Sequence, residues 1–301
     1  MKHKKVVVTG GAGFIGSHLT EKLLNEGYRV VVIDDLSEGK WENLPIHRNL
    51  SKHKISILDD IDGLFKGTEI IFHLAALPRL QRSLDEPQET NRVNIDGTLN
   101  LLMLARKYKV KKFIFASSSS VYGNKNSLPF RENMPVDPLV PYSLQKFVGE
   151  EYCKMFSKLW GIETVGLRYF NVYGLRMNPL SPYANLVPKF INLMSQNKIP
   201  IVNGDGKQSR DFTYISDAVE ATILTANSNL SGEVINIGYG KGISVNRVVK
   251  LINKLLGKNI KPVHGPKVIE PRKTLASNLK AKKLLGWKPK VSFEEGLKRM
   301  I

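Results

Sequence analysis

Two residues four positions apart, Tyr142 and Lys146, are the side chains whose types and spacing best suit acid–base chemistry. On a helix, residues four apart lie on the same face. A phenol with a pKa of about 10 is a poor base at neutral pH, whereas a nearby ammonium group favours the phenolate and lowers that pKa. The pair therefore predicts a phenol that can take a proton from a substrate hydroxyl.

A second pair with the same spacing, Tyr108 and Lys112, serves as a comparison. It lies where a predicted helix ends and a strand begins, with no serines before it, and we interpret Tyr108 as structural. Tyr142 has candidate hydroxyl partners in the serine run 117–120, at the carboxyl end of a predicted strand. Ligands bind at that edge of open parallel sheets. A polar loop is the alternative interpretation, and the sequence alone does not choose among the four serines.

Three glycines at regular spacing, Gly10, Gly13 and Gly16, lie at the junction of the first predicted strand and helix. A backbone that turns sharply and approaches a pyrophosphate has no room for a Cβ atom, and the helix N-terminus offers N–H groups to the phosphates. A plain turn is the alternative. Because a strand, a helix and a second strand follow in the required order, we predict a dinucleotide site.

The second predicted strand ends in Asp34, 18 residues after Gly16. A carboxylate there accepts hydrogen bonds from ribose hydroxyls and repels a 2′-phosphate, and no arginine follows within the next few residues. The sequence therefore predicts NAD rather than NADP as the cofactor. A solvated turn is the alternative for Asp34 and Asp35.

Alternating strands and helices in the first half must position these residues. Right-handed crossovers between such strands place helices on both faces of a sheet, so we predict an α/β fold with a Rossmann-like doubly wound parallel sheet. The predicted strands are 6–9, 29–33, 54–58, 69–74, 112–116 and 163–167, and the predicted helices are 15–25, 91–108 and about 141–160.

Loops and prolines replace this alternation after residue 171. Segments 211–215 and 234–238 have the character of strands that return to the first sheet. We therefore predict a smaller, discontinuous C-terminal substrate domain. The predicted domains are 1–168 with 209–240 for the cofactor, and 169–208 with 241–301 for the substrate.

The composition is that of an ordinary globular protein, with 42% hydrophobic and 24% charged residues. The single cysteine, Cys153, excludes an internal disulfide framework and fits a reducing cytoplasm. No stretch approaches the roughly 18 apolar residues of a membrane span, and the six scattered histidines suggest no metal site. We expect a cytoplasmic protein that binds neither membrane nor metal.

The net charge is +18, and +13 of it lies within residues 241–301. A surface for nucleic acid or anionic lipid is one interpretation. Aromatic residues are not interleaved with these lysines as a base-stacking surface requires. We therefore favour a solvated basic face that attracts an anionic small substrate, and expect no nucleic-acid partner.

Several features together resemble the extended short-chain dehydrogenase/reductase family, and most of all its UDP-hexose 4-epimerases. The likeness covers nearly the whole chain, and it implies a Rossmann domain, a small substrate domain and homodimers formed through a four-helix bundle. The features are the glycine motif, Asp34, 73–76, Asn94, the serine run, Tyr142 with Lys146, 168–171, 204–212 and 285–287.

The resemblance assigns a role to individual residues of this chain. The catalytic residues that it implies are Ser118, Tyr142 and Lys146. The implied cofactor contacts are Gly10, Gly13, Phe14, Ile15, Gly16, Asp34, Asp35, Leu36, Ser37, Asp59, Leu74, Ala75, Ala76, Asn94, Tyr142, Lys146 and Phe170. The implied nucleotide-sugar contacts are Ser118, Tyr142, Asn171, Asn185, Leu186, Arg210, Arg272 and Thr274.

The resemblance also implies the type of reaction. Relatives that dehydrate or decarboxylate the sugar usually carry an acid just after the catalytic serine, where this chain has Ser119 and Ser120. Epimerisation needs only one acid–base group: C4 is oxidised with bound NAD, the 4-keto sugar rotates, and hydride returns to the other face. At the position of Thr274 a small residue leaves room for an acetamido group, which favours UDP-N-acetylglucosamine and UDP-N-acetylgalactosamine, with UDP-glucose and UDP-galactose as further substrates.

Three alternatives stay open. One is a UDP-glucuronate 4-epimerase or another NAD-dependent nucleotide-sugar oxidoreductase on the same scaffold. Another is a non-catalytic NAD-sensing protein, although such proteins typically lose the serine or the tyrosine and this chain keeps both. The third is nucleic-acid binding through the basic C-terminal region, which a salt-dependent shift on DNA would support.

Overall fold

The computed structural model describes residues 4–124, 127–181, 184–266 and 272–301. The chain divides into two compact units, each described by itself below. Unit 1 comprises Met1–Val121, Pro138–Arg168 and Val219–Ile235, and unit 2 comprises Tyr122–Asp137, Tyr169–Ala218 and Asn236–Ile301.

The units differ from the predicted domain ranges at 122–137, 209–218 and 236–240, which lie in unit 2. Side-chain contacts explain this membership. Tyr122 donates to Asn236 Oδ1 (2.7 Å), and Asn236 Nδ2 donates to the carbonyl of Phe130 (3.0 Å). These bonds join segments that the prediction assigned to the cofactor domain within unit 2.

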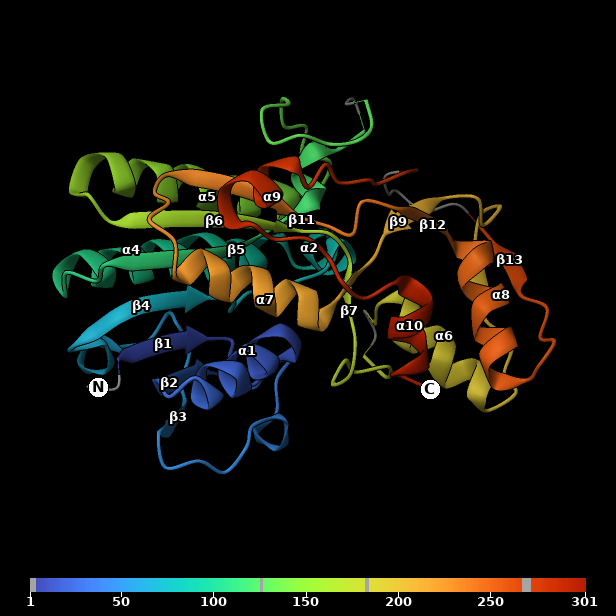
Figure 1. The fold of residues 1–301 in the computed structure, drawn as a ribbon, viewed down its shortest axis with the longest axis horizontal. Coiled ribbons are helices and arrows are strands. Elements are labelled where there is room, and N and C mark those ends of the chain that lie inside the picture. Colours follow the sequence, from blue (N-terminus) through green and yellow to red (C-terminus); the bar gives the residue numbers. More distant parts are fainter. Residues whose placement is uncertain (1–3, 125–126, 182–183, 267–271) are drawn as a thin grey trace. The chain divides into compact units, whose positions relative to one another are not determined.

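A seven-stranded sheet forms the centre of unit 1, with the order β11-β6-β5-β4-β1-β2-β3 (Figure 1). β1 pairs in parallel with β2 and β4, β2 with β3, and β4 with β5, so the predicted doubly wound sheet is confirmed. The chain reverses its direction of travel between β1 and β4, and ligands bind at such a switch point. The strands are β1 (Lys5–Thr9), β2 (Arg29–Asp34), β3 (Leu50–Lys54), β4 (Thr68–His73), β5 (Lys112–Ser118), β6 (Glu163–Tyr169) and β11 (Glu233–Ile237).

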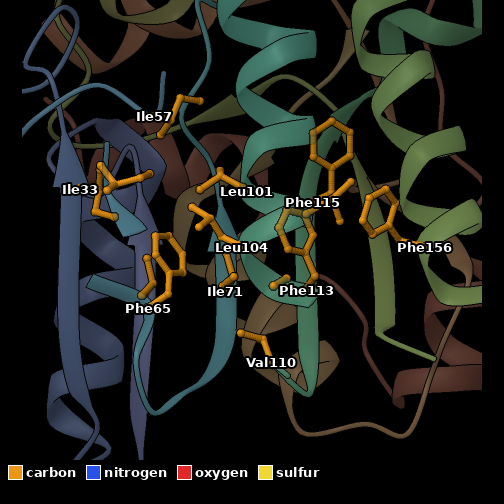
Figure 2. Packing of buried hydrophobic residues seen from close by; sticks show 14 of the residues in the cluster. Ile33, Ile57, Phe65, Ile71, Leu101, Leu104, Val110, Phe113, Phe115 and Phe156 are labelled. Carbon is orange, nitrogen blue, oxygen red and sulfur yellow. The ribbon is translucent and has the colours of Figure 1, made fainter. Parts of the chain in front are cut away.

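The helices that follow these strands cover the sheet. α1 packs against β1 and β2, whereas α4 and α5 pack together and α5 lies on β5. Figure 2 shows Ile71, Phe113 and Phe115 of the sheet beside Leu101 of α4 and Phe156 of α5. The helices of this part of the chain are α1 (Phe14–Asn25), α2 (Leu80–Asp85), α3 (Pro87–Asn91), α4 (Gly97–Lys107), α5 (Pro141–Trp160) and α7 (Ile215–Ala226).

Two predicted strands are wrong. The third strand is β3, at residues 50–54 and not 54–58. Most side chains of β3 are exposed, so its sequence lacks the apolar alternation typical of a strand. The apolar residue Ile57, which suggested the later range, lies beyond the strand and is buried in the core. Segment 211–215 does not join the main sheet, because β9 pairs with β12 and β10 pairs with β7. The predicted helix 91–108 also divides, since a π-helical turn, η3 (Arg92–Asp96), precedes α4.

Unit 2 combines short strand pairs with helices. β10 pairs with β7 and β13 with β8 in parallel, and β12 pairs with β9 antiparallel. α6 packs against α8. The elements are β7 (Val172–Tyr173), α6 (Leu186–Ser195), β8 (Ile201–Asn203), β9 (Ser209–Asp211), β10 (Thr213–Tyr214), β12 (Gly242–Ser244), α8 (Val245–Leu256), β13 (Val263–Gly265), α9 (Leu279–Leu285) and α10 (Phe293–Lys298).

None of the helices built by the described residues has both the length and the apolar character that crossing a bilayer requires.

Candidate active site

The glycine loop between β1 and α1 is too tightly packed for side chains at Gly10 and Gly16. Gly10 has a φ of +69°, and a Cβ atom there would lie 2.6 Å from the backbone nitrogen of Ala75. A Cβ atom on Gly16 would collide with the carbonyl oxygen of Gly10. Gly13 is the N-cap of α1 and provides no side-chain cap. The loop therefore offers backbone N–H groups at a helix N-terminus to a pyrophosphate, as a dinucleotide requires.

Asp34 holds this loop against the end of β2. Its carboxylate accepts hydrogen bonds from the backbone N–H groups of Ala12 (2.8 Å) and Leu36 (2.9 Å). Burial raises the pKa of Asp34, and these backbone hydrogen bonds act in the opposite direction. In the following turn, Asp35 accepts a hydrogen bond from the backbone N–H of Ser37 (2.9 Å). The structure thus brings the turn Asp34–Ser37, which is predicted to contact the ribose, next to the glycine loop.

The other predicted cofactor residues of unit 1 lie in two places. Phe14 and Ile15 begin α1 directly after the loop, and residues 74–76 follow the carboxyl end of β4, where Ala75 N–H donates to Thr9 Oγ1 (3.3 Å). Asp59 is exposed and accepts a hydrogen bond from Ser56 N–H (3.0 Å). The contact of Asp59 with a cofactor stays a prediction.

A buried hydrogen-bond network connects β1 with the helix that carries Tyr142. Thr98 Oγ1 donates to the carbonyl of Asn94 (2.7 Å), so it accepts from His73 Nε2 (2.8 Å), and His73 Nδ1 accepts from Thr9 Oγ1 (2.9 Å). Burial lowers the pKa of His73 well below its usual value, in keeping with this neutral tautomer. Asn94 Nδ2 donates to Gln145 Oε1 on α5 (2.8 Å). Asn94 therefore positions α5 from the π-helical turn η3.

The structure separates the four serines of the run 117–120. Ser118, the last residue of β5, is the serine that acts on the phenol of Tyr142, where it favours a lower pKa. Ser117 instead donates to the buried carboxylate of Glu150. Ser119 is buried, and the Ser120 backbone N–H donates to Ser118 Oγ (3.2 Å). Ser118 is thus the serine placed to bridge Tyr142 and a reacting oxygen.

Lys146 lies one turn beyond Tyr142 and is 4% exposed. Its Nζ is 5.8 Å from the centre of the Tyr142 ring and 4.9 Å from that of Phe115. Burial lowers the pKa of Lys146 to about 8. Both Tyr142 and Lys146 lie on α5, the helix that packs against β5.

Arg79 is a charged neighbour of Tyr142 that the sequence did not suggest. Burial raises the pKa of Tyr142, while the Arg79 guanidinium and the Ser118 side chain act to lower it. Arg79 directly precedes α2 and has a φ of +98°, which non-glycine residues rarely adopt. No sequence signal marks that backbone conformation.

The comparison pair behaves differently. Tyr108 donates its hydroxyl to Asp62 Oδ2 (2.8 Å), near the exposed end of α4. Lys112 is buried and forms an ion pair with Glu163 (3.2 Å) and a hydrogen bond with the carbonyl of Thr225 (3.3 Å). Tyr108 therefore has the structural role that the sequence predicted.

Unit 2 holds the predicted nucleotide-sugar residues that follow residue 168. Asn171 Nδ2 donates to the carbonyl of Asp211 (3.1 Å) and to Thr274 Oγ1 (3.4 Å). Thr274 is 6% exposed and also accepts from Asp211 N–H (3.3 Å). Asn185 precedes α6, and Leu186 is its first residue.

Two arginines complete the predicted nucleotide-sugar residues of unit 2. Phe170, a predicted cofactor residue, lies in the same unit. Arg210 on β9 donates to the carbonyl of Ser209 (2.9 Å), and the exposed Arg272 pairs with Asp205 (3.4 Å). Both guanidinium groups are on one unit and suit a diphosphate. Phe170 is fully buried beside other aromatic rings, and its contact with a cofactor stays a prediction.

Among the described residues, no three or more His, Cys, Asp or Glu side chains are grouped to hold a metal ion.

Comparison with known proteins places this architecture in a family. Residues 6–238 match the family model for the NAD dependent epimerase/dehydratase family. A putative UDP-glucose 4-epimerase of Methanocaldococcus jannaschii is 39% identical over 98% of this chain and 97% of its own length.

Solved structures agree closely in fold. The UDP-N-acetylglucosamine 4-epimerase of Methanobrevibacter ruminantium M1, in complex with UDP-N-acetylmuramic acid, is 39% identical with a TM-score of 0.95, covering 99% of this chain and 97% of that one. The UDP-glucuronic acid 4-epimerase of Bacillus cereus, in complex with UDP-glucuronic acid and NAD, is 36% identical with a TM-score of 0.92, covering 98% and 97%. The chain therefore belongs to the NAD-dependent epimerase/dehydratase family, within the extended short-chain dehydrogenases/reductases, and is an NAD-using enzyme of the isomerase class.

Proposed function

We propose that this chain is a 4-epimerase of UDP-sugars that interconverts UDP-N-acetylglucosamine and UDP-N-acetylgalactosamine, and also UDP-glucose and UDP-galactose. The observation that supports it most is the position of Lys146 one turn beyond Tyr142 on α5, 5.8 Å from the centre of its ring, with Ser118 acting to lower the pKa of the same phenol. One acid–base group suffices for epimerisation, and the serine run contains no carboxylate for an elimination.

The residues of unit 1 fit NAD. Cβ atoms on Gly10 and Gly16 would collide with backbone, so this tight loop needs glycine there, and Asp34 stands beside it, where it would accept ribose hydroxyls. Bound NAD would supply a hydride acceptor that is restored within each turnover.

Tyr142 would take the proton from the C4 hydroxyl and return it after the sugar has turned. Its buried phenol is a weak acid, and Arg79, Lys146 and the Ser118 hydroxyl are the groups that favour the phenolate. Ser118 would also hold the reacting oxygen close to the phenol. Proton transfer thus requires no group beyond Ser118 and Tyr142.

The choice of sugar rests on Thr274, which is small and takes part in the hydrogen bonds of Asn171 and Asp211. A relative of 39% identity is a UDP-N-acetylglucosamine 4-epimerase, which supports the same substrate for this chain. UDP-glucuronate is the second candidate. The cation of Arg79 near Tyr142 favours it, because a guanidinium group can bind the carboxylate of a hexuronate.

We also propose a homodimer formed through α4 and α5. Apolar side chains on these two helices are exposed, and such patches indicate a protein–protein contact. The exposed residues are Met103, Leu144, Met155, Leu159 and Trp160.

The function is tested with the purified enzyme and three substrates: UDP-N-acetylglucosamine, UDP-glucose and UDP-glucuronate. We expect NMR to show inversion at C4 of the first two, with no loss of carbon dioxide. Release of a UDP-pentose from UDP-glucuronate would contradict the epimerase proposal, and inversion of UDP-glucuronate alone would favour the second candidate.

A further inference from the structure

A buried ion pair lies beneath Lys146. Arg168 of β6 grips Glu150 of α5 through two hydrogen bonds, Nε to Oε1 (2.8 Å) and Nη2 to Oε2 (2.7 Å). Glu150 is 0% exposed and Arg168 is 2% exposed. Ser117 donates a third hydrogen bond to the same carboxylate. Removing two charges from water is costly, so a pair this deep needs hydrogen bonds that offset that cost.

Glu150 follows Lys146 by one helical turn, which places both on the same face of α5. The ring of Phe115 on β5 packs against that face of α5. The centre of this ring lies 4.9 Å from Lys146 Nζ, and a Cβ atom on Gly149 would collide with the ring. The Lys146 ammonium group therefore lies over the Phe115 ring, one helical turn from the buried Glu150.

The ionisable groups around Lys146 come from three elements. α5 contributes Tyr142, Glu150 and Cys153, and β4 contributes His73, while Arg168 of β6 is bound to Glu150. Burial raises the pKa of the Cys153 thiol and lowers that of His73, so both are neutral near pH 7. Among the described residues that act on Lys146, Glu150 is the one that carries a negative charge at that pH.

We propose that Glu150 is a positioning residue that keeps Lys146 protonated beside Tyr142, and that Arg168 and Ser117 hold Glu150 in place. The proposal rests on the proposed function, in which Lys146 serves the phenol of Tyr142. It adds a role for three residues that are not among the predicted cofactor or substrate contacts.

The direction of the effect follows from the charges. Burial lowers the pKa of Lys146 to about 8, while Cys153 and Glu150 act to raise it. Removing the Glu150 charge therefore lowers this pKa further. A nearby opposite charge changes a pKa by about 1–3 units, so Glu150→Gln should move the deprotonation of Lys146 down by about one unit or more.

Two measurements on the NAD-bound enzyme test this. NMR of protein with 13C-labelled lysine follows the Cε shift of Lys146 against pH, with Lys146→Arg to assign the signal. The pH profile of kcat/KM then shows whether its alkaline limb moves with that titration. We expect both to move downward in Glu150→Gln and in the charge-balanced Glu150→Gln/Arg168→Gln, and to return toward the parent value in Glu150→Asp.

A matched ion pair elsewhere in unit 1 provides the control. Glu163→Gln removes the partner of the buried Lys112, a loss of the same kind far along β5 from Ser118. It should lower the melting temperature and leave the Lys146 titration unchanged. An unchanged Lys146 titration in Glu150→Gln and in Glu150→Gln/Arg168→Gln would overturn the proposal. Because the NMR titration needs no turnover, absence of epimerase activity in the parent enzyme would contradict the proposed function alone.

Discussion

Ser118 acts on the phenol of Tyr142, whose pKa it lowers, whereas its neighbour Ser117 donates a hydrogen bond to Glu150. The two hydroxyls therefore have different consequences when removed. Ser118→Ala should lower kcat by on the order of 10²–10³, the usual effect of losing a hydrogen bond that acts in the transition state. Ser119→Ala is the control and should retain most of the activity. Equal losses in Ser118→Ala and Ser119→Ala would contradict the role of Ser118.

Tyr142→Phe removes only the ionisable oxygen. The fold and NAD binding should survive, and the epimerisation rate should fall by on the order of 10²–10⁴, as is typical of lost general acid–base catalysis. Tyr108→Phe removes a hydroxyl that bonds Asp62 at the end of α4, and its rate should stay close to that of the parent. The idea fails if both variants lose activity to the same extent.

Asp34→Ala should weaken NAD binding by about 1–3 kcal/mol, the scale of a lost charge-assisted hydrogen bond. Because Asp34 also holds the N–H groups of Ala12 and Leu36, the melting temperature should fall as well. Asp60→Ala is a suitable control, since the exposed Asp60 accepts a local hydrogen bond from Asp62 N–H and is not among the predicted cofactor residues. Acid extraction of the purified protein gives the cofactor directly, and predominantly NADP would refute the interpretation of Asp34.

Thr274→Tyr should suppress the reaction of N-acetylated sugars more than that of unacetylated ones. Overpacking costs roughly 1–3 kcal/mol where an additional group must fit, and the acetamido group needs that space. Thr274 is buried and bonded to Asn171, so Thr274→Val separates loss of the hydroxyl from loss of space. Kinetics on both substrate pairs measure the difference. A parallel decrease on both pairs would remove Thr274 from the specificity argument.

The exposed apolar residues of α4 and α5 predict the oligomeric state. Leu159→Glu combined with Met155→Glu places charges on two exposed positions of α5 and should convert a dimer into a monomer. Light scattering after gel filtration gives the mass. Leu279→Glu, at an equally exposed position of α9, should leave the mass unchanged. A monomeric parent enzyme would refute the dimer.

Patterns of apolar residues and glycines were sufficient to predict the parallel sheet and the helix Pro141–Trp160. They failed where tertiary contacts decide. β3 lies at the edge of the sheet with exposed side chains, so alternation could not reveal it. The segment 122–137 belongs to unit 2 through contacts such as that of Tyr122 with Asn236, more than a hundred residues later.

In the candidate site, too, features set by neighbouring residues could be predicted, whereas features set by tertiary contacts could not. Spacing together with the serine run predicted Tyr142 with Lys146, since Tyr108 and Lys112 have the same spacing, and the glycine pattern predicted the loop for a pyrophosphate. The partner of Tyr142 within the serine run depends on how β5 meets α5, and a sequence does not contain that geometry. Arg79 was missed because its position beside Tyr142 depends on a rare backbone conformation.

The neutral imidazole of His73 sets a lower limit on the working pH. Its folded pKa is well below the unfolded value of about 6.5, so its contribution to stability is present above that value and is lost as the pH falls. A second proton would place a donor where His73 now accepts from Thr9. Acidification would therefore break the hydrogen bond between Thr9 and His73 and destabilise the folded chain, and ring nitrogen shifts of His73 would report its protonation.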